Sequence, residues 1–199
     1  MAEKTRKLAP ATLLILLAVA SFAAAAITIT NITEWRVYAK TPPIVKVDGK
    51  LKGYNYGNYV TVDTYFAEED GTNRTVISVL GFTGDPVRYD NVIYICNKDY
   101  QNYKYKVKLV YKQVLEHAGT TTWDYVQWIK LYFGPYTLTI PGASETGYVE
   151  IPATPGSNCV PVSVEVLVKP KAKDAGVADG NTMLVNVEVD VVAEGPVSP

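Results

Sequence analysis

Histidine is almost absent from this 199-residue chain, and its scarcity limits the catalytic chemistry that the chain can support. The single histidine, His117, would have to act as the base of any Ser–His–acid or Cys–His site. No Gly-x-Ser-x-Gly motif is present to supply a nucleophile. The run Glu68-Glu69-Asp70 places its carboxylates side by side in sequence, where they would diverge instead of facing each other across a sugar. We therefore predict that the protein is not an enzyme and has no catalytic residues.

The chain also lacks the patterns of metal and nucleic-acid sites. One histidine and two distant cysteines cannot form a usual zinc ligand set. The 19 basic residues are balanced by 20 acidic ones, so no excess positive charge favours nucleic acid. Acidic turns are usually only hydrated, and we predict no cofactor and no metal. Calcium stays an alternative at two oxygen-rich loops, which contain Glu68, Glu69, Asp70 and Asn73, and Asp174, Asp179 and Asn181.

The N-terminus has the three parts of a secretory signal peptide. Basic residues precede an apolar run from Leu8 to about Ala20, and Ala24 and Ala26 satisfy the small-x-small cleavage rule. We predict a signal peptide over residues 1–26, an extracellular or cell-surface location, and membrane contact only during export. One alternative is an uncleaved anchor, because 8–26 could nearly span a bilayer. Another is a type IV prepilin that is cut before the apolar run and keeps it as a helix.

Only two cysteines are present, and their even number suits an exported chain. Secreted proteins usually pair such cysteines, so we predict a Cys96–Cys159 disulfide. The alternative is two separate buried thiols. Closing a loop of this length would stabilise the fold by about 4 kcal/mol on the chain-entropy model.

After the leader, apolar residues recur with a period of two, which is typical of half-buried antiparallel strands. Turn signals such as Asp70-Gly71 and Pro155-Gly156 separate the runs. We predict an all-β fold with no helix, in which residues 41–199 form a single jelly-roll-like β-sandwich. Thr75–Phe82, Val92–Cys96 and Ile129–Phe133 look buried on both faces. The other predicted strands are Val60–Phe66, Tyr103–Lys112, Tyr136–Ile140, Gly147–Ile151, Val162–Val168 and Met183–Val191.

Residues 27–40 differ from the rest, because no tight turn folds them back as a hairpin. The segment Ile27-Thr28-Ile29-Thr30-Asn31-Ile32-Thr33 is strongly β-forming, and Thr41-Pro42-Pro43 then interrupts strand pairing. Ile32 breaks the alternation, so we expect a bend or bulge near 31–34. Either the segment pairs within its own domain, or it pairs with another molecule.

Two sequons predict N-glycosylation, at Asn31 and at Asn73. Asn73 follows an Asp-Gly turn and is expected to be exposed. Asn31 has the same parity as Ile27 and Ile29, so a glycan there would conflict with burial of those isoleucines. Asn73 is therefore the stronger candidate.

A cluster of aromatic residues supports a second class of function. On a β-sandwich, exposed rings could stack on sugars, as in carbohydrate-binding modules. More often, aromatic residues in strands form core and cross-strand contacts. The cluster consists of Trp123, Tyr125, Trp128, Tyr132 and Tyr136.

The order of leader, β-forming segment and single sandwich resembles the TasA/camelysin-like biofilm matrix proteins, in particular archaeal bundling-pilus subunits. The nearest local similarities are Ile93–Asn97 leading into Tyr103–Tyr111, and the closing Val162–Val168 and Leu184–Val192 strands. The resemblance implies a structural subunit that polymerises head-to-tail with itself by donor-strand complementation. It also implies that the donor strand is about Ile27–Ala39, with Ile27–Thr33 as its β-forming part.

Overall fold

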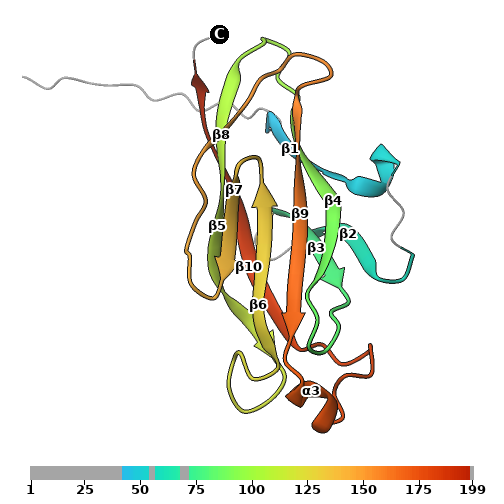
Figure 1. The fold of residues 1–199 in the computed structure, drawn as a ribbon. Helices are drawn as coiled ribbons and strands as arrows, with labels where there is room; N and C mark the ends of the chain where they lie inside the picture. The colour runs from blue at the N-terminus through green and yellow to red at the C-terminus, as the bar shows by residue number, and fades with distance from the viewer. Residues whose placement is uncertain (1–41, 54–56, 68–71, 198–199) are drawn as a thin grey trace, which may run out of the picture. The chain divides into compact units, whose positions relative to one another are not determined.

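The computed structural model describes residues 42–53, 57–67 and 72–197 (Figure 1). The chain divides into two units, 1–40 and 41–199, and all described residues belong to the second. Within the described residues there is one short α-helix, α3 (Lys171–Asp174), and one 3₁₀ turn, η1 (Gly49–Lys52). The strands are β1 (Ile44–Asp48), β2 (Val60–Ala67), β3 (Thr72–Val79), β4 (Val87–Asn97), β5 (Lys104–His117), β6 (Val126–Phe133), β7 (Tyr136–Ile140), β8 (Val149–Ile151), β9 (Cys159–Val168) and β10 (Val185–Val197).

The strands form three antiparallel sheets. The largest has the order β1-β4-β9-β6-β7, the second has the order β10-β5-β8, and β2 pairs with β3 as a separate hairpin. From β4 to β10 the chain passes from the first sheet to the second at most connections, and only β6 and β7 are consecutive neighbours. In Figure 1 the five-stranded sheet lies in front of β5 and β10. The predicted all-β sandwich is confirmed.

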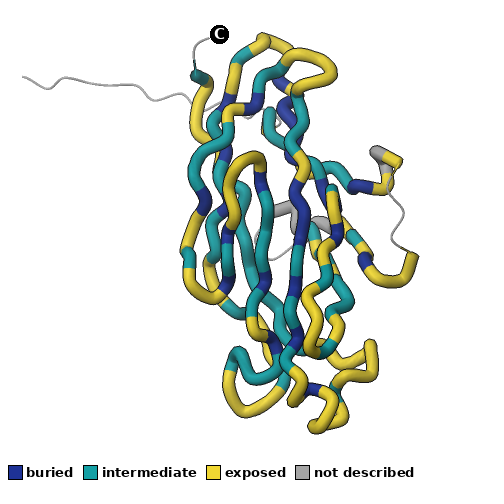
Figure 2. Tube along the Cα trace, viewed as in Figure 1, coloured by how far each residue is buried: buried dark blue, intermediate teal, exposed yellow. Residues whose placement is uncertain are grey.

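The core lies between the sheets and comes from the alternating residues of their inner faces. On β9, Val162, Val164, Val166 and Val168 are each at most 5% exposed. On β5, the alternation of buried Tyr105, Val107 and Leu109 with lysines follows the predicted pattern. Figure 2 shows the buried positions spaced along the strands, with exposed residues gathered in the turns. Period two in the sequence thus becomes one packed and one hydrated face.

Several details differ from the sequence prediction. β1 was not expected, and α3 is a single helical turn where no helix was expected. The 75–82 run was expected to be buried on both faces, but Val76 and Phe82 are 41% and 47% exposed. β3 belongs to the two-stranded hairpin, so one of its faces is open to solvent.

Candidate functional site

The outer strands of the two larger sheets differ in how their free edges are protected. β1 and β7 have five residues each and β8 has three. Each also lies beside a proline: Pro43 precedes β1, Pro141 follows β7 and Pro152 follows β8. Short length and adjacent proline are common ways to prevent unwanted strand addition. β10 has 13 residues and contains no proline before Pro196, so it is the least protected of these four edges.

The regular backbone of β10 leaves that edge well suited to pairing. Three irregularities interrupt its ladder with β5; the first two place the extra residue on β5, and the third, at Gly195 and Pro196, lies beyond Glu194. Asn186 and Val187 pair with Glu116 and Val114, which leaves Leu115 as the first extra residue. The second extra residue is Lys112, between the partners of Glu188 and Val189. β10 therefore continues without a bulge of its own from Val185 to Glu194.

One hydrogen bond shows which backbone groups of β10 face outward. The amide of Ala118 donates to the carbonyl of Leu184 at 3.0 Å, so the Leu184 carbonyl points toward β5. Backbone groups alternate in direction along a strand, so those of Asn186 and Glu188 also face β5. Those of Val185, Val187 and Val189 face the other way. Within the described residues, no strand pairs with β10 on that side.

The apolar face of β10 is less covered than the matching face of β9. Both strands carry valine at every second position, and both valine sets pack toward the same core. The four β9 valines are buried, whereas Val185, Val187, Val189 and Val191 of β10 are only half-buried. Among the described strands, β9 lies between two others and β10 has one neighbour. The position at the edge therefore accounts for the residual apolar exposure.

The layer opposite the five-stranded sheet is divided into two separate sheets. Val60 of the β2–β3 hairpin is buried, and Val62, Ile77 and Val79 pack against the common core. Gly81, just after β3, lies so close to the inner face of β9 that a Cβ atom there would be 2.5 Å from Val168 Cγ2. Yet, in the part of the chain that the structure describes, no strand pairing joins the hairpin to β10. One layer is thus a continuous sheet, whereas its opposite is two sheets with separate edges.

The predicted donor segment, Ile27–Thr33, lies outside the described residues together with Asn31 and the signal peptide. The backbone of Asn73 lies in β3, opposite Phe66, but its side chain is not described. Use of either sequon therefore stays a prediction. The disulfide between Cys96 and Cys159 is present.

The second predicted calcium loop has its own internal hydrogen bonds. The Asp179 carboxylate accepts from the amides of Asn181 and Thr182 and from the Thr182 hydroxyl, and these bonds lower the pKa of Asp179. The first loop lies largely outside the described residues. In the part of the chain that is described, no three His, Cys, Asp or Glu residues gather as metal ligands. His117 is the exposed last residue of β5.

The aromatic cluster does not form a shared open surface. Trp123 and Tyr125 pack against the core. The Nζ atom of Lys130 lies 4.0 Å from the ring centre of Trp128. The Arg88 guanidinium of β4, on the far side of β9 from β6, lies 4.2 Å from the ring centre of Tyr132. Cations therefore cover Trp128 and Tyr132, which disfavours sugar stacking on those two rings. Tyr136 also lies outside the core; it is 40% exposed, and its ring lies against Gly147.

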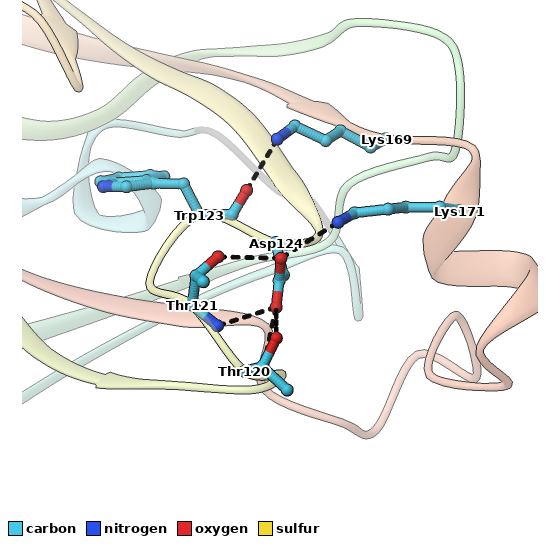
Figure 3. Close-up of polar contacts among 6 residues, drawn as sticks. All are labelled: Thr120, Thr121, Trp123, Asp124, Lys169 and Lys171. Carbon is cyan, nitrogen blue, oxygen red and sulfur yellow. Dashed lines mark hydrogen bonds and ion pairs between the residues drawn. The ribbon is translucent and has the colours of Figure 1, made fainter.

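A polar cluster centred on Asp124 fastens the β5–β6 connection to the segment after β9 (Figure 3). Its carboxylate accepts from the amides of Thr120 and Thr121, at 2.7 and 2.8 Å. Lys171 Nζ of α3 lies 3.1 Å from Oδ1, and Lys169 Nζ donates to the Trp123 carbonyl at 2.7 Å. Hydrogen bonds from Thr121, then Lys171 and Thr120, hold the pKa of Asp124 below its usual value. The cluster therefore links two loops of the same molecule.

A scan against known protein families finds no match, and neither does a search of curated protein sequences. No helix in the described segments has the length and apolar character needed to cross a membrane. Since no known family indicates a function, the functional proposal rests on the edge of β10 described above.

Proposed function

We propose that this protein is a structural subunit of an extracellular filament, a pilus or a biofilm matrix fibre, that polymerises head-to-tail. The N-terminal strand of one copy, Ile27–Thr33, completes the sandwich of the next. The observation that carries the proposal is the divided layer, which combines a continuous sheet on one side with two unjoined sheets on the other. The resemblance to TasA/camelysin-like proteins favours the same mode of assembly.

The physical basis is the unused bonding capacity of a sheet edge. A free edge presents amide and carbonyl groups in a row, together with the margin of the apolar face. A strand from another molecule can pair with the backbone and cover the apolar margin in one step. Because the contact joins two different surfaces, it continues from copy to copy and produces a fibre.

Export of the chain is the second part of the proposal. The Cys96–Cys159 disulfide suits an oxidising compartment, and disulfides are rare in the reducing cytosol. Removal of residues 1–26 would make Ile27 the first residue, so the donor strand would begin at a free terminus. A terminal strand can leave its own domain without breaking the chain path of the sandwich.

Negative-stain electron microscopy of the purified mature chain tests the proposal. The mature protein should form fibres, and deletion of Ile27–Thr33 should abolish them while leaving a folded β-rich monomer. Two double variants of unchanged length test whether the inward isoleucines are needed. Ile27→Asn with Ile29→Asn should prevent fibres, whereas Thr28→Ser with Thr30→Ser should preserve them. Unchanged fibres from the deletion variant would refute the assembly mode. A mature chain that stays monomeric at all concentrations would refute the function.

A further inference from the structure

We infer that the acceptor for the added strand is β10, within Val185–Glu194, and that the partner is the Ile27–Thr33 segment of a second copy. This inference rests on the proposed filament function and goes beyond it by naming the surface that receives the strand. The same segment would place Ile27 and Ile29 toward the core, and Thr28 and Thr30 toward solvent.

Length and regularity favour β10 over the other edges. At about 3.3 Å per residue, the ten regular residues from Val185 to Glu194 extend over about 33 Å, whereas a seven-residue donor needs about 23 Å. β1, β7 and β8 are too short to match it. The outward amides and carbonyls recur at every second residue, beginning at Val185. A donor strand could thus pair along its regular part, up to the bend or bulge expected near 31–34.

The side chains of β10 also match the donor in pattern. Its half-buried valines recur at every second position, as Ile27 and Ile29 do. An added strand with isoleucines on the inner side would extend the apolar layer beside those valines. On the other face, Glu188 accepts from Gln113 Nε2 at 2.8 Å and Asp190 lies 3.8 Å from Lys112 Nζ. These acids already have partners on β5, so Thr28 and Thr30 would meet a neutralised polar surface.

The competing acceptor is the β2–β3 hairpin, whose strands have eight residues each. Its inner residue Val60 is only 1% exposed, so the apolar surface at the start of the hairpin is already covered, whereas Val62, Ile77 and Val79 are half-buried like the β10 valines. None of the four inner valines of β10 is buried to that extent. An incoming strand therefore gains more apolar contact at β10 than at the start of the hairpin.

Proline substitution tests the edge directly, because it removes one amide at a chosen position. The Val189 amide faces outward, so Val189→Pro leaves the ladder to β5 intact and blocks strand addition. Val189→Ala is the matched control, since it loses similar apolar area and keeps the amide. We expect Val189→Pro to remain a folded monomer by circular dichroism, with a loss of fibre mass of about tenfold or more. Fibre formation equal to that of Val189→Ala would overturn the inference.

Disulfide cross-linking locates the donor even if the proline variant fails to fold. Both native cysteines are in the Cys96–Cys159 bond, so engineered cysteines are the only free ones. Each chain carries two engineered cysteines: Thr30→Cys in the donor segment, and Glu188→Cys, Asp190→Cys or Val192→Cys on β10. The hairpin control chains keep Thr30→Cys and carry Thr61→Cys or Asp63→Cys in place of the β10 cysteine. Oxidised fibres from at least one β10 chain should give a ladder of covalent oligomers on a non-reducing gel, and hairpin chains should remain monomeric.

The outcomes separate this inference from the proposed function. Ladders from the hairpin chains, or fibres without any β10 ladder, would overturn β10 as the acceptor while leaving the filament function intact. Absence of fibres from the unsubstituted mature chain would remove both. A β10 ladder in fibres that dissolve when Ile27 and Ile29 are replaced by asparagine would support both.

Discussion

Cys96 on β4 lies directly opposite Cys159 on β9, with Cα atoms 4.0 Å apart, and a disulfide joins the central strand of the larger sheet to its neighbour. The bond closes a loop with a sequence separation of 63 residues. We predict that Cys96→Ala with Cys159→Ala lowers the free energy of unfolding by about 4 kcal/mol, because the unfolded chain regains the entropy of that loop. Urea denaturation checks the prediction. A loss below about 1 kcal/mol would contradict the proposed stabilising role of the bond.

Asn97, the residue after Cys96, is fully buried and joins three segments of backbone. Its Nδ2 donates to the carbonyls of Tyr103 and Ile151, and its Oδ1 accepts from the Asp99 amide. Asn97→Leu removes all three bonds, two of which are buried. We expect a loss of about 3 kcal/mol or more in urea denaturation. Tyr100→Ala, at a residue that is 95% exposed, is the control and should change stability by less than about 0.5 kcal/mol.

Asp124 should make stability depend on pH in the acid range. Its pKa is lowered in the folded state, chiefly by the Thr121 amide and hydroxyl, so its ionised form stabilises the fold. The stabilisation is present above the unfolded pKa of about 3.9 and is lost as the pH falls below that value. Asp124→Asn should lower the urea midpoint at pH 7. Between pH 4 and pH 2, the midpoint of this variant should fall less than that of the unsubstituted protein.

Lys171→Ala distinguishes the sources of that pH dependence. It removes the ion pair and retains the Thr120 and Thr121 hydrogen bonds, which include the largest cause of the shift. Most of the acid-range decline should therefore persist in Lys171→Ala. If this variant abolished the decline as fully as Asp124→Asn, the ion pair and not the loop amides would control the carboxylate.

The first residue of the exported protein separates the three accounts of the N-terminus. We predict that intact-mass measurement of the cell-surface protein finds Ile27 first, because Ala24 and Ala26 satisfy the cleavage rule. A start near Leu8 would indicate a type IV pilin that keeps its apolar helix. A start at Met1 or Ala2 would indicate an uncleaved anchor, and neither result fits a free donor strand.

The strands most visible in the sequence were those whose pattern follows from a half-buried face. The Tyr105–Leu109 and Val162–Val168 alternations correspond to inner-face residues of β5 and β9. β1 was missed because its five residues pair with β4 about 50 positions later, a contact that local pattern does not reveal. Gly49 shows the same limit: a Cβ there would lie 2.1 Å from the Asn91 carbonyl oxygen, a tertiary constraint on an ordinary-looking turn.

Of the two partners in the proposed contact, only the donor segment could be predicted from the sequence. The β-forming, turn-free segment from Ile27 is visible in the sequence, since propensity and turn signals are local. Its proposed acceptor is not, because β9 and β10 carry the same alternating valines, and the number of neighbours that each has among the described strands is not visible in the sequence. The bulges at Leu115 and Lys112, which leave β10 regular, likewise arise only when β5 and β10 pair.

Cryo-electron microscopy of fibres assembled from the mature chain measures the central relationship directly. We predict a strand of density with the side chains of Ile27–Thr33 beside Val185–Glu194 of the adjacent subunit, with Ile27 and Ile29 facing the core. Density that connects this segment to its own sandwich, or a fibre core built from helices of residues 8–26, would contradict it.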